Sequence, residues 1–254
     1  MAIVFVLIGC SPSQSNNDSK GTEQREIELT ISAAASLRNA LSELKSLFEQ
    51  SNNNIKIAYN FGSSGALQQQ ITQGAPVDMY FSAAKDKYDY LVDEGMIAQG
   101  VNLLTNELVL IAPKEHGTNI SKFEDLTSPN ISQLAIGIPE SVPAGKYAKE
   151  ALLHMDLWEK VEDKLILSKD VRQVLTYVET GNVDAGMVYK TDALISSDIE
   201  IVDVTHKSNH SSIIYPVGII KDTKNIHEVG QFFEFLQSEQ ALTVFEKFGF
   251  KPLE

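Results

Sequence analysis

Four short segments of the sequence have residue types that suit anion binding: Ala35-Ser36, Ser63-Ser64, Pro143-Ala144 and Asp170-Val171. Each stands between a run with the alternation of a strand and a run with the spacing of a helix. The first N–H groups of a helix have no acceptor within the helix, and the helix dipole places partial positive charge there. If these helix starts converge, they could hold a dianion together with the hydroxyls of Ser36 and Ser64. Taken singly, each segment is more simply explained as a helix cap.

The segment Leu29 to Leu47 shows this design most clearly. Leu29 to Ser32 alternate as a strand does, and Ala33 to Ala35 are small enough to let a turn pass close to a ligand. From Leu37 onward the apolar residues recur at helical spacing. Ser36 therefore falls where strand gives way to helix, and we expect it to be the N-cap of that helix.

Other reactive residues form weaker patterns. Phe61 to Gly65 has its glycines at the wrong spacing for a nucleophile elbow, and the sequence has no Gly-Lys-Ser/Thr phosphate loop. A hydrolase that uses Ser36 or Ser64 as nucleophile remains an alternative, but no His or Lys stands in a motif that would activate either serine. His206 and His210 have a spacing that could suit a metal, yet they lie in a polar loop, which favours ordinary surface histidines.

The charge of the chain argues against several classes of partner. The 254 residues carry a formal net charge of −13, which makes nucleic acid an unfavourable ligand. A ligand-sensing regulator is a further alternative, but the sequence has neither a helix-turn-helix segment nor a basic stripe. An acidic surface also offers an anion no long-range attraction. A bound anion must therefore be held by short-range dipoles in a closed site.

The single cysteine, Cys10, excludes an internal disulfide and a cysteine-based metal cluster. Leu7-Ile8-Gly9-Cys10 has the pattern of a lipobox, in which the cysteine becomes the lipidated N-terminus after cleavage. We therefore predict a signal peptide over residues 1–9, lipidation of Cys10 and a flexible tether over residues 10–25, which are mostly polar. No Lys or Arg precedes the apolar run, so a buried strand with an ordinary core cysteine remains the alternative.

Strand and helix patterns alternate along the rest of the chain, which predicts an α/β fold with mainly parallel sheets. About nine strands are too many for one comfortable sheet, so we expect two lobes joined by two crossings near Asn106 and Ser212. Residues 26–106 and 213–254 would form lobe I, and residues 107–212 lobe II. The last helix is expected to run unbroken from His227 to about Phe245. Ligands of such sheets bind at the carboxyl ends of strands, which places the four turns in a hinged cleft between the lobes.

A series of motifs in a fixed order resembles one known family, the molybdate-binding proteins of bacterial molybdate ABC transporters. The resemblance covers about residues 27–252, and it is the order of the motifs that makes it specific. The motifs are Ala-Ala-Ala-Ser-Leu (33–37), Phe-Gly-Ser-Ser-Gly (61–65), Gly-Ala-Pro-Val-Asp (74–78), Val-Pro-Ala-Gly-Lys-Tyr (142–147), Asp-Val-Arg (170–172), Gly-Met-Val-Tyr (186–189), Tyr-Pro-Val (215–217) and Phe-Glu-Lys-Phe-Gly-Phe (245–250).

The resemblance implies a two-lobed periplasmic-binding-protein fold of type II with the ligand cleft between the lobes. It also implies that serine hydroxyls, backbone N–H groups and one tyrosine hydroxyl bind the oxygens of molybdate or tungstate, without direct ligation of the metal. Carried over position by position, the ligand-binding residues are Ser36, Ser64, Ala144, Val171 and Tyr189. From its strand pattern alone, Tyr189 would be a half-buried core aromatic. Gly62, where relatives often have alanine, and the acidic Asp170 depart from the family pattern.

The resemblance further implies a role in transport. The chain would be a monomeric, extracytoplasmic, lipid-anchored binding protein rather than an enzyme, would need no cofactor, and would deliver its ligand to a membrane permease driven by an ATPase. A binding protein for sulfate or another tetrahedral oxyanion is the alternative within the same class, because cavity size cannot be read from the sequence. A site built from donors alone should in any case prefer fully deprotonated dianions.

Overall fold

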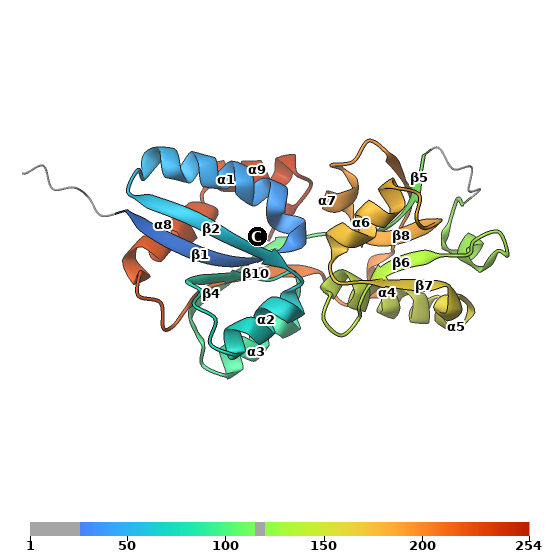
Figure 1. The fold of residues 1–254 in the computed structure, drawn as a ribbon, viewed down its shortest axis with the longest axis horizontal. Coiled ribbons are helices and arrows are strands. Elements are labelled where there is room, and N and C mark those ends of the chain that lie inside the picture. The colour runs from blue at the N-terminus through green and yellow to red at the C-terminus, as the bar shows by residue number, and fades with distance from the viewer. Residues whose placement is uncertain (1–25, 115–119, 254) are drawn as a thin grey trace, which may run out of the picture.

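The computed structural model describes residues 26–114 and 120–253 and has two lobes, each built on one β-sheet covered by helices (Figure 1). The predicted signal peptide, tether and Cys10 lie outside the described residues. The two lobes with a cleft between them agree with the two-lobed α/β fold expected from the sequence.

The first lobe contains a six-stranded sheet with the order β11-β4-β10-β3-β1-β2. Helix α1 lies against this sheet through its apolar face, which includes the buried Leu41, Leu44 and Phe48. The strands are β1 (Ile27–Ala34), β2 (Ile55–Gly62), β3 (Met79–Phe81), β4 (Ile97–Thr105), β10 (Ile214–Ile220) and β11 (Lys251–Pro252). The helices are α1 (Arg38–Ser51), α2 (Ser64–Thr72), α3 (Lys85–Asp93), α8 (Ile226–Leu236) and α9 (Glu239–Lys247).

The second lobe contains a five-stranded sheet with the order β7-β6-β8-β5-β9. Strands β5 and β8 are fully buried, as wholly apolar strands covered on both faces should be. The strands are β5 (Leu108–Pro113), β6 (Leu134–Gly137), β7 (Leu165–Ser168), β8 (Ala185–Tyr189) and β9 (Ile199–Val204). The helices are α4 (Pro143–His154), α5 (Trp158–Val161), α6 (Val171–Glu179) and α7 (Lys190–Ala193).

Each sheet is mixed rather than mainly parallel. The pairs β1–β2, β1–β3, β6–β7 and β6–β8 are parallel, whereas β10, β4, β5 and β9 pair antiparallel. Two parallel neighbouring strands must be joined by a crossover, usually a helix, within the same lobe. Strands β5 and β10 are instead each preceded in the sequence by a strand of the other lobe. The parallel part is the part that matters for the site, because its strands β1, β2, β6 and β7 lead into helices at their carboxyl ends.

The structure corrects one predicted element and adds another. The predicted helix over residues 227–245 is two helices, and Ser238 caps the second through a bond from the Ala241 N–H. Strand β4 was not predicted, because its sequence Ile-Ala-Gln-Gly-Val-Asn-Leu-Leu-Thr lacks regular alternation. It is held as a strand by antiparallel pairing with β10, which is a long-range effect.

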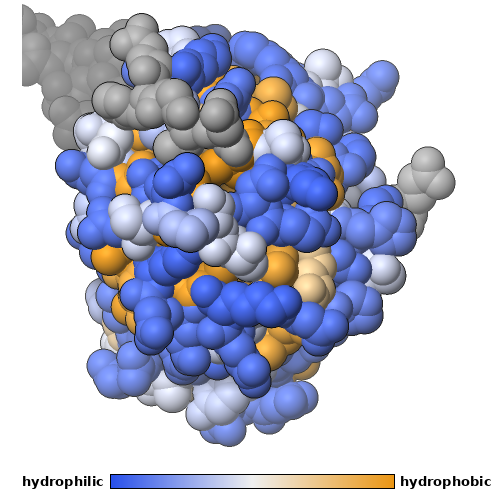
Figure 2. Space-filling model, turned by 90° about the vertical axis from the view of Figure 1, so that its right-hand side faces the viewer, coloured by the Kyte–Doolittle hydropathy of each residue, from blue (hydrophilic) through white to orange (hydrophobic). Residues whose placement is uncertain are grey.

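The chain passes from the six-stranded to the five-stranded sheet between Thr105 and Leu108, and it returns between Val204 and Ile214. Figure 2 shows the far end of the second lobe, where hydrophilic residues dominate and apolar residues form separate patches among them. Within the described part of the chain, none of the helices combines the length and the apolar character needed to cross a membrane.

Candidate functional site

A small pocket lies between the two lobes at the carboxyl ends of the parallel strands. Its cavity volume is only about 10 Å³, near the smallest volume that holds one water molecule. The pocket is therefore small and confined. Its lining includes all five residues singled out from the sequence, Ser36, Ser64, Ala144, Val171 and Tyr189, together with Ala34, Ala35, Gly62, Ser63, Ala83, Val142, Pro143 and Asp170.

Ser36 is not the N-cap that its position suggested. It lies within a short 3-10 turn, Ala35–Leu37, that joins β1 to α1, and its side chain makes no capping bond. Instead its Oγ lies 3.0 Å from the hydroxyl of Tyr215, and the residue is 3% exposed. The hydroxyl is thus held by a residue 179 positions away, which local sequence patterns do not reveal.

Ser64 begins α2, while its neighbour Ser63 is the N-cap that accepts a bond from the Ala66 N–H. The Oγ of Ser64 accepts a 2.9 Å hydrogen bond from the Ala83 N–H. A backbone N–H can only donate, so the proton of the Ser64 hydroxyl is free to point into the pocket. The two adjacent serines therefore differ in role: Ser63 holds the helix, and Ser64 offers a donor.

Helices α4 and α6 of the second lobe also direct their N-termini at the pocket. Helix α4 begins at Pro143 and has no side-chain cap, which leaves the Ala144 N–H without an intrahelical acceptor. It packs so closely on the end of β6 that a Cβ on Gly145 would lie 1.9 Å from the Gly137 carbonyl oxygen. At α6, the Asp170 carboxylate accepts a 2.9 Å bond from the Gln173 N–H. Asp170 is thereby satisfied by its own helix, as an acid beside an anion site needs to be.

Tyr189 ends β8 and is almost completely buried. Its hydroxyl donates across the cleft to the Ala83 carbonyl oxygen over 3.4 Å, a long bond for which an oxyanion could compete. Burial, with a contribution from neighbouring Tyr215, raises the pKa of Tyr189 well above its usual value. The hydroxyl therefore keeps its proton at neutral pH and acts as a donor.

Two charged side chains close to the pocket, Arg172 and Asp192, are paired with each other. Arg172, which follows Val171 on α6, makes a 2.6 Å ion pair with the fully buried Asp192 of α7. Its guanidinium also donates to Asn39 Oδ1 over 3.0 Å and to the Ser36 carbonyl oxygen over 3.4 Å. Arg172 thus joins the lobes directly behind Ser36. Burial raises the pKa of Asp192 to about 6, although Arg172 opposes the shift.

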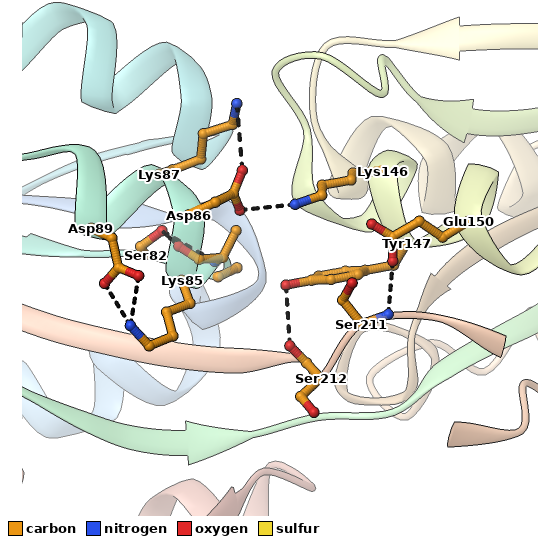
Figure 3. A network of polar contacts seen from close by, with 12 residues as sticks. Ser82, Lys85, Asp86, Lys87, Asp89, Lys146, Tyr147, Glu150, Ser211 and Ser212 are labelled. Atoms are coloured by element: carbon orange, nitrogen blue, oxygen red, sulfur yellow. Dashed lines mark hydrogen bonds and ion pairs between the residues drawn. The ribbon is translucent and has the colours of Figure 1, made fainter. Parts of the chain in front are cut away.

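Further contacts join the lobes around the pocket. The Gly65 N–H of α2 donates to the Ser141 carbonyl oxygen over 2.9 Å, and a Cβ at Gly65 would lie 2.7 Å from that oxygen. At the edge of the cleft, Lys146 of α4 points to Asp86 of α3 and forms a 3.2 Å ion pair with it (Figure 3). Both of these side chains are well exposed, so the pair is screened by solvent. The lobes are therefore closed on each other at the pocket.

The residues that carried the alternative functions do not gather into a site. His206 is exposed, and its ring pairs with Ser208 in the loop. Within residues 26–114 and 120–253 there is no group of three or more His, Cys, Asp or Glu side chains placed to hold a metal ion. The partners of Ser36 and Ser64 are a tyrosine hydroxyl and a backbone N–H, neither of which is the base that a nucleophilic serine needs.

Two lobes that close over one small pocket lined by helix N-termini define a ligand-binding protein of the two-lobed α/β type. The sequence profile of the family described as "Bacterial extracellular solute-binding protein" matches residues 29–251. The chain belongs to this family, whose members bind solutes outside the cytoplasm and are not enzymes.

Individual relatives agree with this assignment. The chain is 52% identical to the "Putative ABC transporter substrate-binding lipoprotein YvgL" of Bacillus subtilis, over 97% of this chain and 94% of the relative. It is 36% identical to the "Molybdate-binding protein ModA" of Haemophilus influenzae, over 88% and 89% of the two chains. A solved structure, the "substrate binding domain of putative molybdenum ABC transporter from Clostridium difficile", is 42% identical, with a TM-score of 0.69 over 89% of this chain and 99% of that one.

Proposed function

We propose that this chain captures molybdate, and tungstate as its close analogue, outside the cytoplasm and delivers it to an ABC permease driven by an ATPase. One observation carries the proposal: Ser36, Ser64, Ala144, Val171 and Tyr189, which come from both lobes, line one small pocket. The names of the relatives from Haemophilus influenzae and Clostridium difficile support molybdate in particular.

The chemistry of the lining supports a fully deprotonated dianion as the ligand. The pocket offers the hydroxyls of Ser36, Ser64 and Tyr189 and the backbone N–H groups at the starts of α4 and α6. Hydrogen bonds to a charged group contribute about 1.5–3 kcal/mol each, so several together can offset the cost of removing the anion from water. The nearest guanidinium, Arg172, is already paired with Asp192 and supplies little net charge. The ligand is cargo, so the proposed function requires no cofactor.

Calorimetry with molybdate, tungstate, sulfate and phosphate tests the proposal. We expect tight binding of molybdate and tungstate, weaker binding of sulfate because its shorter bonds leave the donors out of reach, and weakest binding of phosphate because its proton lacks an acceptor. A protein that binds sulfate more tightly than molybdate would identify the cargo as sulfate and overturn the proposal.

The proposed transport role includes a lipid anchor at Cys10, supported by the Leu7-Ile8-Gly9-Cys10 sequence and by the name of the Bacillus subtilis relative. Both halves of the pocket come from one chain, which supports a monomer as the working unit. Replacing Cys10 by serine in an exported full-length chain should move the protein from the membrane fraction to the soluble extracytoplasmic fraction. A variant that still sediments with membranes would disprove the anchor, and Ser11→Ala is the matched control.

A further inference from the structure

A network of hydrogen-bonded side chains lies behind Ser36, outside the pocket lining. The Tyr215 hydroxyl lies 3.0 Å from Ser36 Oγ, and Asn106 Nδ2 lies 3.1 Å from the same hydroxyl. Asn106 stands in the crossing between the lobes, and its Nδ2 also donates to Thr191 Oγ1 over 2.9 Å. Tyr215 is fully buried on β10.

The donors and acceptors in this network can be assigned by starting from Asn106. Asn106 Oδ1 accepts a 2.9 Å bond from the Glu107 N–H, which fixes Nδ2 as the group that faces Tyr215. Nδ2 can only donate, so the Tyr215 oxygen accepts from it. The Tyr215 proton then has Ser36 Oγ as its acceptor, because a buried hydroxyl proton without a partner is costly. Burial raises the pKa of Tyr215 well above its usual value, so this proton is retained.

Ser36 Oγ therefore accepts from Tyr215 and has its own proton left for the pocket. Ser64 reaches the same state through the Ala83 N–H, but that donor is backbone and cannot be exchanged by mutation. The carboxylate at the pocket, Asp170, has its Oδ1 engaged by the Gln173 N–H. Tyr215 is thus the side chain that occupies one of the two lone pairs of Ser36 Oγ and leaves the Ser36 proton for a ligand.

We propose that Tyr215 and Asn106 are positioning residues that lock Ser36 as a hydrogen-bond donor and thereby make the site reject protonated oxyanions. The inference rests on the proposed function, oxyanion binding in this pocket. A hydrogen phosphate ion must donate its proton to some acceptor, and a serine whose oxygen already accepts from Tyr215 is a poor one. Without the Tyr215 hydroxyl, Ser36 can rotate and accept that proton.

The experiment compares Tyr215→Phe with the wild-type full-length chain by calorimetry at a pH near 8. Molybdate measures the strength of the site. Sulfate and phosphate measure selectivity, because at this pH both are dianions of similar size and differ in one proton. We expect molybdate affinity to fall about tenfold, equivalent to about 1.4 kcal/mol, and phosphate affinity to rise about tenfold relative to sulfate. Asn106→Ala, which removes the donor that orients Tyr215, should change selectivity in the same direction by less.

The matched control is Tyr59→Phe, which removes a partly buried hydroxyl that donates to the Leu41 carbonyl oxygen outside the pocket lining. Thermal unfolding of each variant separates loss of fold from loss of selectivity. If the wild-type chain binds molybdate and Tyr215→Phe leaves the sulfate-to-phosphate ratio unchanged, the inference is wrong while the proposed function stands. If the wild-type chain binds no tetrahedral oxyanion, both fail.

Discussion

Ser64→Ala is expected to lower the affinity for molybdate by about tenfold to a hundredfold. The variant removes one hydrogen bond to a charged ligand, worth about 1.5–3 kcal/mol, and about 1.4 kcal/mol corresponds to tenfold. It also leaves the buried Ala83 N–H without its acceptor, which should lower the free energy of unfolding as well. Ser36→Ala and Tyr189→Phe should fall within the same range. Calorimetric titration with molybdate measures each loss.

The adjacent Ser63 provides the control for this prediction. Its hydroxyl also lies at the pocket, but it accepts the Ala66 N–H and acts as a helix cap. Ser63→Ala should therefore reduce the free energy of unfolding by about 1 kcal/mol and change molybdate affinity little. Equal loss of affinity in both variants would show that the pocket does not distinguish the two serines, contrary to the assigned roles.

The sequence located the pocket well because its elements are local. A strand that ends in small residues before a helix is visible in a few neighbouring residues, and the carboxyl ends of parallel strands meet at one edge of a sheet. The turns at Ser64, Ala144 and Val171 are each visible in the sequence, although only the set of turns indicates an anion site. Tyr189 could not, because a tyrosine at the end of a buried strand looks like a core residue, and only the family resemblance pointed to it.

What the sequence did not predict depends on contacts between distant residues. The role of Ser36 was misassigned because Tyr215, its partner, lies in a strand that enters the first lobe from the second. Asp192 was overlooked because a single acid in a short helix has no pattern. In the folded chain Asp192 is fully buried against Arg172, so the positive charge of that guanidinium is paired and is not available to a ligand.

Arg172→Gln should have a large effect on both stability and ligand binding. The substitution removes the partner of a fully buried carboxylate, and breaking such a pair costs about 3–5 kcal/mol of stability while the carboxylate is charged. It also leaves that negative charge close to the bound dianion. We expect a loss of molybdate affinity at pH 8 greater than that of Tyr189→Phe, with a lower free energy of unfolding in chemical denaturation.

The pH dependence of this loss follows from Asp192. Burial raises its pKa to about 6 in the wild-type chain, and removal of Arg172, which lowers that pKa, raises it further. A raised pKa means that the folded state holds the proton more tightly than the unfolded state, so stability falls as pH rises through the window between the two values. Arg172→Gln should therefore bind molybdate nearly normally in mildly acidic solution and lose affinity as the pH rises toward 8.5.

The double variant Arg172→Gln/Asp192→Asn distinguishes a paired charge from a ligand-binding charge. With the carboxylate gone there is no buried charge left to compensate, so affinity should return to within about tenfold of wild type and no longer vary across this pH range. Lys146→Gln is the control for loss of one positive charge, because its partner Asp86 is exposed and screened. If the double variant still fails to bind molybdate while Tyr189→Phe binds it, the guanidinium itself holds the anion, and a site made of neutral donors is the wrong description.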